Sequence, residues 1–146
     1  ERFRAIWKGI ELISREIPVI FPVHPRTKNL FPDILRSGGN SLRLIEPVSY
    51  LTMLAMVRDA LLVITDSGGV QKEAFLLGTP CVTVRDTTEW PETVQAGANT
   101  LVAADPEALH QAACTMMGLE FEMKDNPFGT GTASLAIAGF TRDHYL

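Results

Sequence analysis

One stretch of the chain, residues 61–84, constrains the fold more than any other. It begins with the apolar run LLVIT, passes through the turn DSGG into an amphipathic segment, and returns after Gly78 to a second apolar run, PCVTV. Short apolar runs bounded by turn residues are typical of strands that are buried on both faces. Because a helical pattern separates the two runs, the stretch predicts a strand, a helix and a second strand parallel to the first.

The same alternation continues along the chain. Strands are predicted at residues 17–23, 41–45, 61–65, 80–84 and 99–103. Helices are predicted at residues 1–14, 49–60, 69–78 with Gly78 as the C-cap, from Pro91, and from Pro106 with Asp105 as the N-cap. Strands without polar alternation, separated by helices, indicate the α/β class: a Rossmann-like three-layer α/β/α domain with a mostly parallel sheet.

The two ends of the chain suggest a larger protein. The whole sequence, residues 1–146, is expected to form one domain. The segment after residue 23 is expected to be a polar loop, followed by one helical turn near residues 31–35 and a turn at residues 37–40. Glu1 lies directly in a helical pattern, so we expect a piece of a longer polypeptide. Residues 124–146 contain a glycine-rich loop and a helix-like segment interrupted by Gly139, and we expect this tail to pack on another domain.

Composition excludes several functions. Thirteen basic and seventeen acidic residues give a net charge of -4 without a block of like charges, which argues against a nucleic-acid or membrane surface. No apolar run approaches the roughly 20 residues that span a bilayer, and no targeting signal opens the chain. Cys81 and Cys114 lack metal-ligand spacing and are expected to be core thiols of a cytoplasmic protein. His110 and His144 are assigned no role.

The turn TDSGG lies where the strand at 61–65 meets its helix, at the edge of a parallel sheet where ligands bind. Free N–H groups at a helix start attract anions, and Gly68 and Gly69 let a phosphate come close. Ser67 adds a hydroxyl, and Glu73, one turn later, can accept hydrogen bonds from ribose hydroxyls. These residues suit a nucleoside diphosphate. Alternatively, Asp66 and Ser67 only cap the helix and the glycines only form a tight turn.

Other polar residues follow neighbouring strands. His24 could donate to a phosphate or sugar oxygen and Arg26 could add charge, although a solvated loop histidine explains the same pattern. Arg85 could neutralise phosphate charge. Residues 87–89 could line a sugar site or cap the helix that begins at Pro91, and for Thr88 we expect the cap.

DSGG also occurs at the nucleophile turn of trypsin-like proteases. Those enzymes are all-β, whereas this serine leads into a helix, and the chain offers no Ser, His and Asp set with supporting spacing. The sequence therefore argues against a serine protease.

Taken together, these motifs resemble the non-hydrolysing UDP-N-acetylglucosamine 2-epimerases. The matching blocks are TDSGG at 65–69, LGTP at 77–80, RDTTEWPE at 85–92, PVHPR at 22–26 and NPFGTGTAS at 126–134. The resemblance implies one half of a two-domain architecture of the glycosyltransferase-B type, of which this chain is the C-terminal UDP-binding domain. It also implies interconversion of UDP-GlcNAc and UDP-ManNAc by elimination and re-addition of UDP, without metal or other cofactor.

The resemblance assigns roles residue by residue. Ser67, Gly68 and Gly69 would hold the diphosphate, Glu73 the ribose, and the backbone near Met53 the uracil. His24 and Arg26, from the PVHPR block, are candidates for a phosphate, sugar or allosteric contact. No catalytic residue is expected in this chain, because the family's catalytic carboxylates and histidine belong to the N-terminal part. The family further implies a cytoplasmic homodimer that serves cell-surface polysaccharide biosynthesis.

The chain departs from the family pattern at a few positions. Trp90 replaces an arginine, Met53 replaces an aromatic residue, and Thr130 and Thr132 replace Asp and Lys. These changes keep two alternatives open: the donor-nucleotide domain of a glycosyltransferase, or a degenerate nucleotide-binding module without catalysis. RDTTE after the strand at 80–84 favours a non-hydrolysing epimerase over a transferase and over a hydrolysing epimerase.

Overall fold

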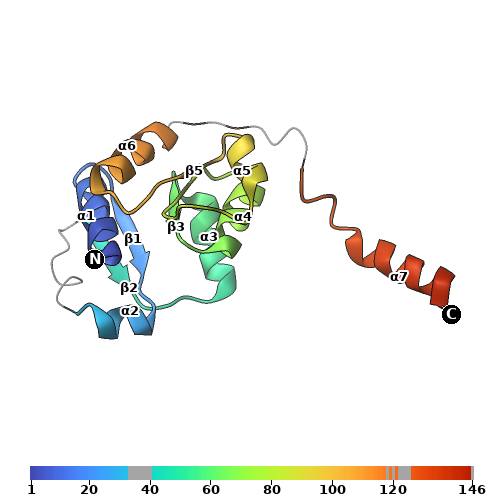
Figure 1. Cartoon of the computed structure of the whole chain (residues 1–146). Helices are drawn as coiled ribbons and strands as arrows, with labels where there is room; N and C mark the ends of the chain where they lie inside the picture. The colour runs from blue at the N-terminus through green and yellow to red at the C-terminus, as the bar shows by residue number, and fades with distance from the viewer. Residues whose placement is uncertain (33–40, 118, 120, 122–125, 146) are drawn as a thin grey trace.

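Strands and helices alternate along the computed structural model, which describes residues 1–32, 41–117, 119, 121 and 126–145 (Figure 1). The strands are β1 (Val19–Pro22), β2 (Leu42–Ile45), β3 (Val63–Thr65), β4 (Cys81–Thr83) and β5 (Asn99–Leu101). The helices are α1 (Arg2–Ser14), α2 (Pro25–Leu30), α3 (Tyr50–Asp59), α4 (Gly68–Leu77), α5 (Pro91–Gln95), α6 (Pro106–Met116) and α7 (Ala133–Tyr145). The predicted α/β class is confirmed, and each predicted strand is present with shorter bounds.

All strand pairs are parallel, as expected, but the strands form two hydrogen-bonded sheets. One contains β1 and β2 with Val19 opposite Leu42; the other has the order β3-β4-β5, with Val63 opposite Cys81 and Cys81 opposite Asn99. Parallel neighbours need a crossover connection, and each one here contains a helix. The carboxyl ends of β3 and β4 therefore meet at one edge, together with the start of α4.

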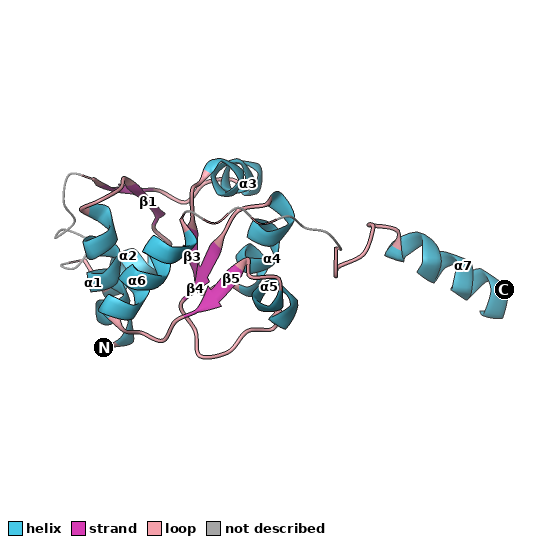
Figure 2. Cartoon of the chain, turned by 90° about the horizontal axis from the view of Figure 1, so that it is seen from above, coloured by secondary structure: helices cyan, strands magenta, loops and turns pink. Residues whose placement is uncertain are grey.

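Helices cover both faces of the strands, which gives the predicted three layers (Figure 2). Side chains alternate between the faces of a strand. In the β4 segment, Val82 and Val84 face the larger apolar cluster with α1 and α6, whereas Cys81 faces a smaller cluster with α3 and α4. Burial raises the pKa of the Cys81 thiol to about 11, so this cysteine is a protonated core residue at neutral pH.

Helices α1 and α6 pack closely against each other. Gly9 lies against Leu109, so closely that a Cβ atom on Gly9 would be 2.8 Å from Leu109 Cδ2. Leu109 is 1 % exposed and belongs to the larger cluster, with Trp7 and Ile13 from α1. The helix predicted at residues 1–14 is therefore present, and it buries one face that includes Trp7, Ile10 and Ile13.

Three helix caps were predicted, and the structure confirms two of them. Asp105 Oδ1 accepts a hydrogen bond from Ala108 N at 2.7 Å, and Gly78 adopts a left-handed φ of 77° after α4, so both predicted caps are confirmed. The predicted cap at Thr88 is wrong: Trp90 occupies the N-cap position of α5. The Thr88 hydroxyl donates to Gln71 Oε1 and accepts from Trp90 N at 3.0 Å, so it bonds to the N-cap residue and not to the first turn of the helix.

The last helix, α7, stands apart from the body of the molecule (Figure 1). It has no buried residue, and it continues through Gly139, where an interruption was expected; glycine lowers helix stability without breaking the helix. Some predictions lie outside the described residues: the turn at 37–40, residues 33–35 of the helical turn expected near 31–35, and residues 124–125 and 146 of the predicted tail. Among the described helices, none is both long and apolar enough to cross a bilayer.

Candidate functional site

The start of α4 directly follows β3. Ser67 is the N-cap, with its hydroxyl 3.5 Å from Val70 N, and its own N–H donates to Thr65 Oγ1 at 3.0 Å. Gly68 and Gly69 are the first two residues of the helix, so their N–H groups have no carbonyl within the helix to bond. The helix dipole adds a partial positive charge here. A capping serine and an anion site are compatible, because the long Ser67 contact leaves its hydroxyl weakly engaged.

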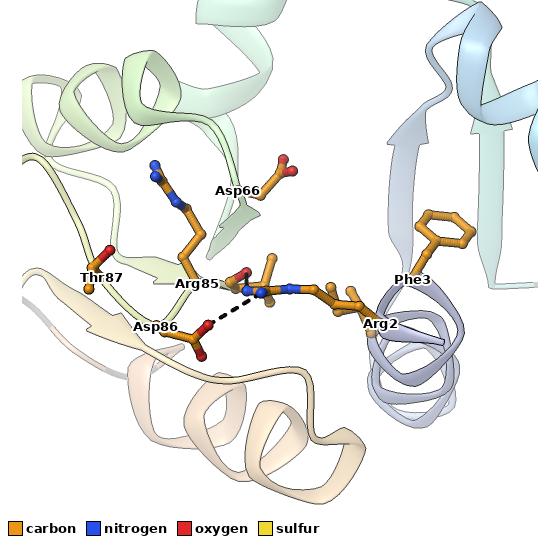
Figure 3. Close-up of a pocket in the computed structure, with 8 residues that line it drawn as sticks. Arg2, Phe3, Asp66, Arg85, Asp86 and Thr87 are labelled. Atoms are coloured by element: carbon orange, nitrogen blue, oxygen red, sulfur yellow. Dashed lines mark hydrogen bonds and ion pairs between the residues drawn. The ribbon is translucent and has the colours of Figure 1, made fainter.

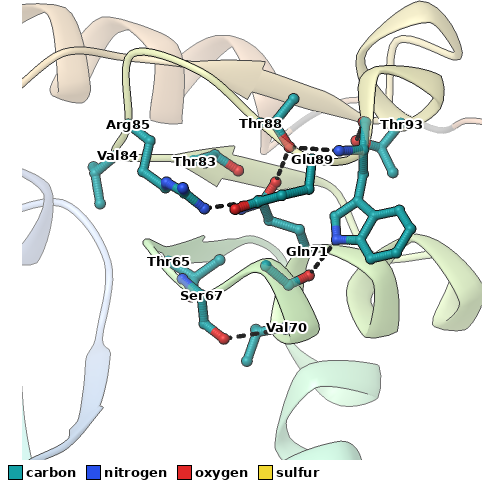
Figure 4. A network of polar contacts seen from close by, with 12 residues as sticks. Thr65, Ser67, Val70, Gln71, Thr83, Val84, Arg85, Thr88, Glu89 and Thr93 are labelled. Atoms are coloured by element: carbon teal, nitrogen blue, oxygen red, sulfur yellow. Dashed lines mark hydrogen bonds and ion pairs between the residues drawn. The ribbon is translucent and has the colours of Figure 1, made fainter.

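An ion pair lies over this helix start. Arg85 Nη1 donates to Glu89 Oε2 at 2.8 Å, and the same carboxylate oxygen would be 3.1 Å from a Cβ atom on Gly68 (Figure 4). The backbone N–H of Glu89 and the Arg85 guanidinium hold the pKa of the Glu89 carboxyl below its usual value. The resulting stabilisation is present above the pKa of the unfolded chain and is lost as pH falls through the lowered pKa.

Trp90 links the same loop to α4. Its indole Nε1 donates to the Gly68 carbonyl at 2.8 Å, and its ring meets Phe128 edge-on with centroids 5.4 Å apart. Lys72 Nζ lies 4.6 Å from the Trp90 ring centroid and 4.4 Å from that of Phe128. The residue that departs from the family pattern therefore bonds directly to the glycine turn, and a lysine supplies a cation nearby.

A buried polar network fixes the loop behind the site, and sequence reasoning missed it. Gln71 is 0 % exposed; its Oε1 accepts from Thr88 Oγ1 at 2.6 Å and from Asn99 Nδ2 at 3.5 Å. Asn99 also accepts from Thr83 Oγ1 at 2.8 Å and donates to Thr93 Oγ1 at 3.1 Å. The network joins α4, β4, α5 and β5, so it holds residues 85–90 against α4. The sequence signal that could have indicated this network was Asn99, a polar residue within the predicted strand at 99–103.

Glu73 lies on α4 within reach of α3. Hydrogen bonding to the Glu73 carboxylate, aided by its charge, raises the pKa of the Tyr50 hydroxyl, which lies at the start of α3. The structure therefore places Tyr50 beside Glu73, and sequence reasoning missed this tyrosine. The available signal was its position after the end of a strand, which the other candidate residues share. Met53 is half-buried one turn along α3, and its N–H donates to Ser49 O at 2.9 Å.

The Glu73 and Tyr50 contact gives a direct prediction. In a Tyr145→Phe background Tyr50 is the remaining tyrosine of the two. Glu73→Gln should lower its pKa towards the ordinary value of about 10, because the acceptor loses its charge. Ultraviolet titration of the phenolate measures this shift, and Glu107→Gln, on α6, is the control. An unchanged Tyr50 pKa in Glu73→Gln would contradict the contact.

His24 and Arg26 lie further from this helix start, at the end of β1. The segment expected to be a loop contains the short helix α2, whose N-cap is His24: its Nδ1 accepts from Arg26 N at 3.2 Å, and Pro25 fits the first turn. Both side chains are exposed. The histidine therefore caps α2 through its Nδ1 atom.

An open pocket of about 590 Å³ adjoins the ion pair, between the start of α1 and the ends of β3 and β4 (Figure 3). Arg85 and Asp66 line one side. Arg2 lines the other and pairs with Asp86 at 3.3 Å, while its Nη2 donates to Val84 O at 3.2 Å. Arg85 therefore lines this pocket and also belongs to the ion pair over the start of α4. Together, Arg2 and Arg85 place two positive charges at the carboxyl edge of the sheet.

Comparison with known proteins assigns the family. A family model described as UDP-N-acetylglucosamine 2-epimerase matches residues 1–142. The chain belongs to this epimerase family. It is 47% identical over 145 residues to the UDP-N-acetylglucosamine 2-epimerase of Methanocaldococcus jannaschii, covering 94% of this chain and 39% of that protein. A UDP-2,3-diacetamido-2,3-dideoxy-D-glucuronate 2-epimerase of Pseudomonas aeruginosa is 45% identical over 124 residues, which are 84% of this chain and 34% of that protein.

Solved structures of epimerases agree. The M. jannaschii UDP-GlcNAc 2-epimerase in complex with UDP-GlcNAc and UDP superposes with a TM-score of 0.86 at 39% identity, covering 97% of this chain and 41% of that one. The family resemblance expected from TDSGG and RDTTE is confirmed. The chain spans about two fifths of the length of this epimerase.

Proposed function

We propose that this chain is the UDP-binding domain, at the C-terminal end, of a UDP-N-acetylglucosamine 2-epimerase that interconverts UDP-GlcNAc and UDP-ManNAc by elimination and re-addition of UDP. The observation that carries the proposal is the start of α4, where Ser67, Gly68 and Gly69 present a hydroxyl and helix N–H groups at the carboxyl edge of the sheet. The M. jannaschii structure of matching fold is described as a complex with UDP-GlcNAc and UDP, which supports the same nucleotide here.

Each part of the nucleotide has a candidate partner. The diphosphate lies at Ser67, Gly68 and Gly69, and Arg85 leaves Glu89 to neutralise its charge. Glu73, one turn along α4, accepts from the ribose hydroxyls. The uracil lies against α3 near Met53. His24 and Arg26 are reserved for the sugar, a phosphate or an allosteric ligand.

The rest of the enzyme lies outside this chain. Because the chain spans 39% of the M. jannaschii relative, we place the catalytic carboxylates and histidine in the remaining length. We further propose that α7 packs on that part in a glycosyltransferase-B arrangement, since Leu135, Ile137 and Phe140 of α7 are 73%, 66% and 57% exposed. A homodimer follows from the family resemblance, and light scattering of the longer protein tests it.

The location of the enzyme is part of the same proposal. Cys81 and Cys114 are free thiols, which suits a reducing cytoplasm. There the enzyme would supply UDP-ManNAc for cell-surface polysaccharide. Fractionation of cells that produce the longer protein tests this location.

Titration calorimetry tests the nucleotide site. UDP should bind the chain, and 2′-deoxy-UDP should bind roughly 10-fold more weakly because it cannot donate its missing hydroxyl to Glu73. In Glu73→Gln the difference between the two nucleotides should shrink, since the charged acceptor is gone. Absence of UDP binding would overturn the proposal, and an unchanged preference in Glu73→Gln would overturn the role of Glu73.

The reaction is tested separately. The purified chain should not turn over UDP-GlcNAc, because proton abstraction and leaving-group protonation need groups from the rest of the enzyme. The longer protein in heavy water should incorporate deuterium at C2 of the sugar, which a glycosyltransferase would not do. Turnover by the chain alone would contradict the assignment. Parallel assays with the diacetamido-glucuronate sugar named for the Pseudomonas relative test the choice of sugar.

A further inference from the structure

Three side chains of different chemistry meet on the surface formed by α1 and α6. Glu16 lies two residues after α1, and His110 and Cys114 lie one turn apart on α6. His110 Nε2 is 2.8 Å from Glu16 Oε1, Cys114 Sγ is 3.9 Å from Glu16 Oε2, and the sulfur and the imidazole nitrogen are 3.7 Å apart. This cluster cannot be found from a local sequence pattern, because Glu16 and His110 are 94 positions apart.

Cys114 was expected to be a core thiol, and this expectation is wrong: the residue is exposed. On α6 the buried positions are Leu109, Ala113 and Met116, so a residue directly after Ala113 points away from the core. His110 is on the same outer side, one turn earlier, with its side chain 29% exposed.

The position of the cluster is fixed by the core. Gly9 and Leu109 hold α1 against α6, and Ser14 Oγ donates to Glu11 O within the last turn of α1. Because Glu16 precedes β1, it lies near the amino ends of the strands, whereas Ser67 lies at the carboxyl edge. The cluster is therefore separate from the nucleotide site.

We propose that Glu16, His110 and Cys114 bind a divalent transition-metal ion of the zinc class. A tetrahedral zinc with bonds of about 2.3 Å to sulfur and about 2.0 Å to nitrogen and oxygen separates its ligand atoms by about 3.3–3.6 Å. The sulfur and the imidazole nitrogen are 3.7 Å apart, close to this range, and the two oxygens of Glu16 lie 2.8 Å from the nitrogen and 3.9 Å from the sulfur. With one oxygen taken from Glu16, the three ligand atoms all lie within 4.8 Å of one another. Small side-chain rotations admit the ion between the three ligand atoms.

The ligand types select the metal. Thiolate and imidazole favour zinc, cobalt or nickel over magnesium and calcium, which take oxygen ligands. On binding, the Cys114 sulfur loses its proton to solvent and gains a bond to the metal, His110 binds through Nε2, and Glu16 supplies one carboxylate oxygen. Water fills the fourth position, because the cluster faces solvent. The ion joins the end of α1 to α6 and stabilises their contact.

The experiment uses the tag-free chain with Zn²⁺ alone, in competition with a coloured chelator. We expect one ion per chain, and a loss of affinity of about 10-fold or more for Cys114→Ser, His110→Ala and Glu16→Gln separately. His144→Ala on α7 is the matched control and should bind as the parent does. Excess Zn²⁺ should raise the thermal midpoint of the parent and the control, since it binds the folded state.

Cobalt provides a second readout. Co²⁺ bound to the chain should give a sulfur-to-metal charge-transfer band that is absent in Cys114→Ser. The proposal is overturned if the parent binds no Zn²⁺, if all three ligand variants bind it as tightly as His144→Ala does, or if the cobalt band is missing. UDP titrations of the same variants should be unchanged, so this result is independent of the proposed nucleotide site.

Discussion

Replacing Gly68 with valine is expected to weaken UDP binding by about 100-fold, because a branched side chain would cover the amides that meet the diphosphate. The space at this position is already filled: a Cβ atom would lie 3.1 Å from Glu89 Oε2 and 3.6 Å from Trp90 Nε1. The carboxylate would be pushed from its 2.8 Å contact with Arg85, which disturbs the cation assigned to the same phosphate. Calorimetric titration measures the change in affinity.

Gly139→Val is the matched control. A Cβ atom on Gly139 meets nothing within 4 Å, and the residue lies in the exposed helix α7. This variant should bind UDP as tightly as the parent does. Equal affinities of Gly68→Val and Gly139→Val would show that the phosphate does not approach the start of α4. Unfolding curves of both variants separate lost binding from lost structure.

Truncating Leu109 to alanine is expected to lower the free energy of unfolding by about 2–5 kcal/mol, the usual cost of a large-to-small change in a packed core. The residue is 1 % exposed and lies against Gly9, which has no side chain that could fill the space left by the truncation. A chain of this size loses roughly 2–4 °C in Tm per kcal/mol. Urea unfolding followed by circular dichroism measures the loss.

Leu51→Ala shows how much of that loss comes from burial. Leu51 is 76% exposed on α3, and its truncation should change the free energy of unfolding by less than about 0.5 kcal/mol. A loss in Leu109→Ala as small as that of Leu51→Ala would mean that the contact between α1 and α6 does not contribute to stability. Both variants remove the same atoms from a leucine, so the comparison differs only in how deeply the leucine is buried.

The fold could be predicted because its signals are local. The apolar run at 61–65, the glycine turn and the helical period after it lie within about twenty residues, and each strand repeats the same pattern. The caps at Asp105 and Gly78 were likewise readable, since each involves residues three or four positions away. The short helix α2 was missed because its six residues carry no apolar period.

Contacts between distant segments could not be predicted. Gln71 and Asn99 are 28 residues apart, and a glutamine on a helix gives no sign that it will be buried against a strand. Trp90 was identified only as a departure from a motif, whereas the structure shows its indole bonded to Gly68. Cys114 was assigned to the core because free cysteines are usually buried, and the face of α6 that it occupies depends on where α1 packs.

The division of the strands into two hydrogen-bonded sheets has a consequence for motion. The pair β1-β2 and the trio β3-β4-β5 share an apolar cluster that includes Leu42 and Val82, but each sheet has its own backbone ladder. Apolar side chains that are in contact can slide past one another by small amounts, whereas movement within one continuous sheet would break backbone hydrogen bonds between its strands. The half of the molecule that carries His24 can therefore tilt relative to the half that carries Ser67, and amide exchange rates should fall into two groups along that boundary.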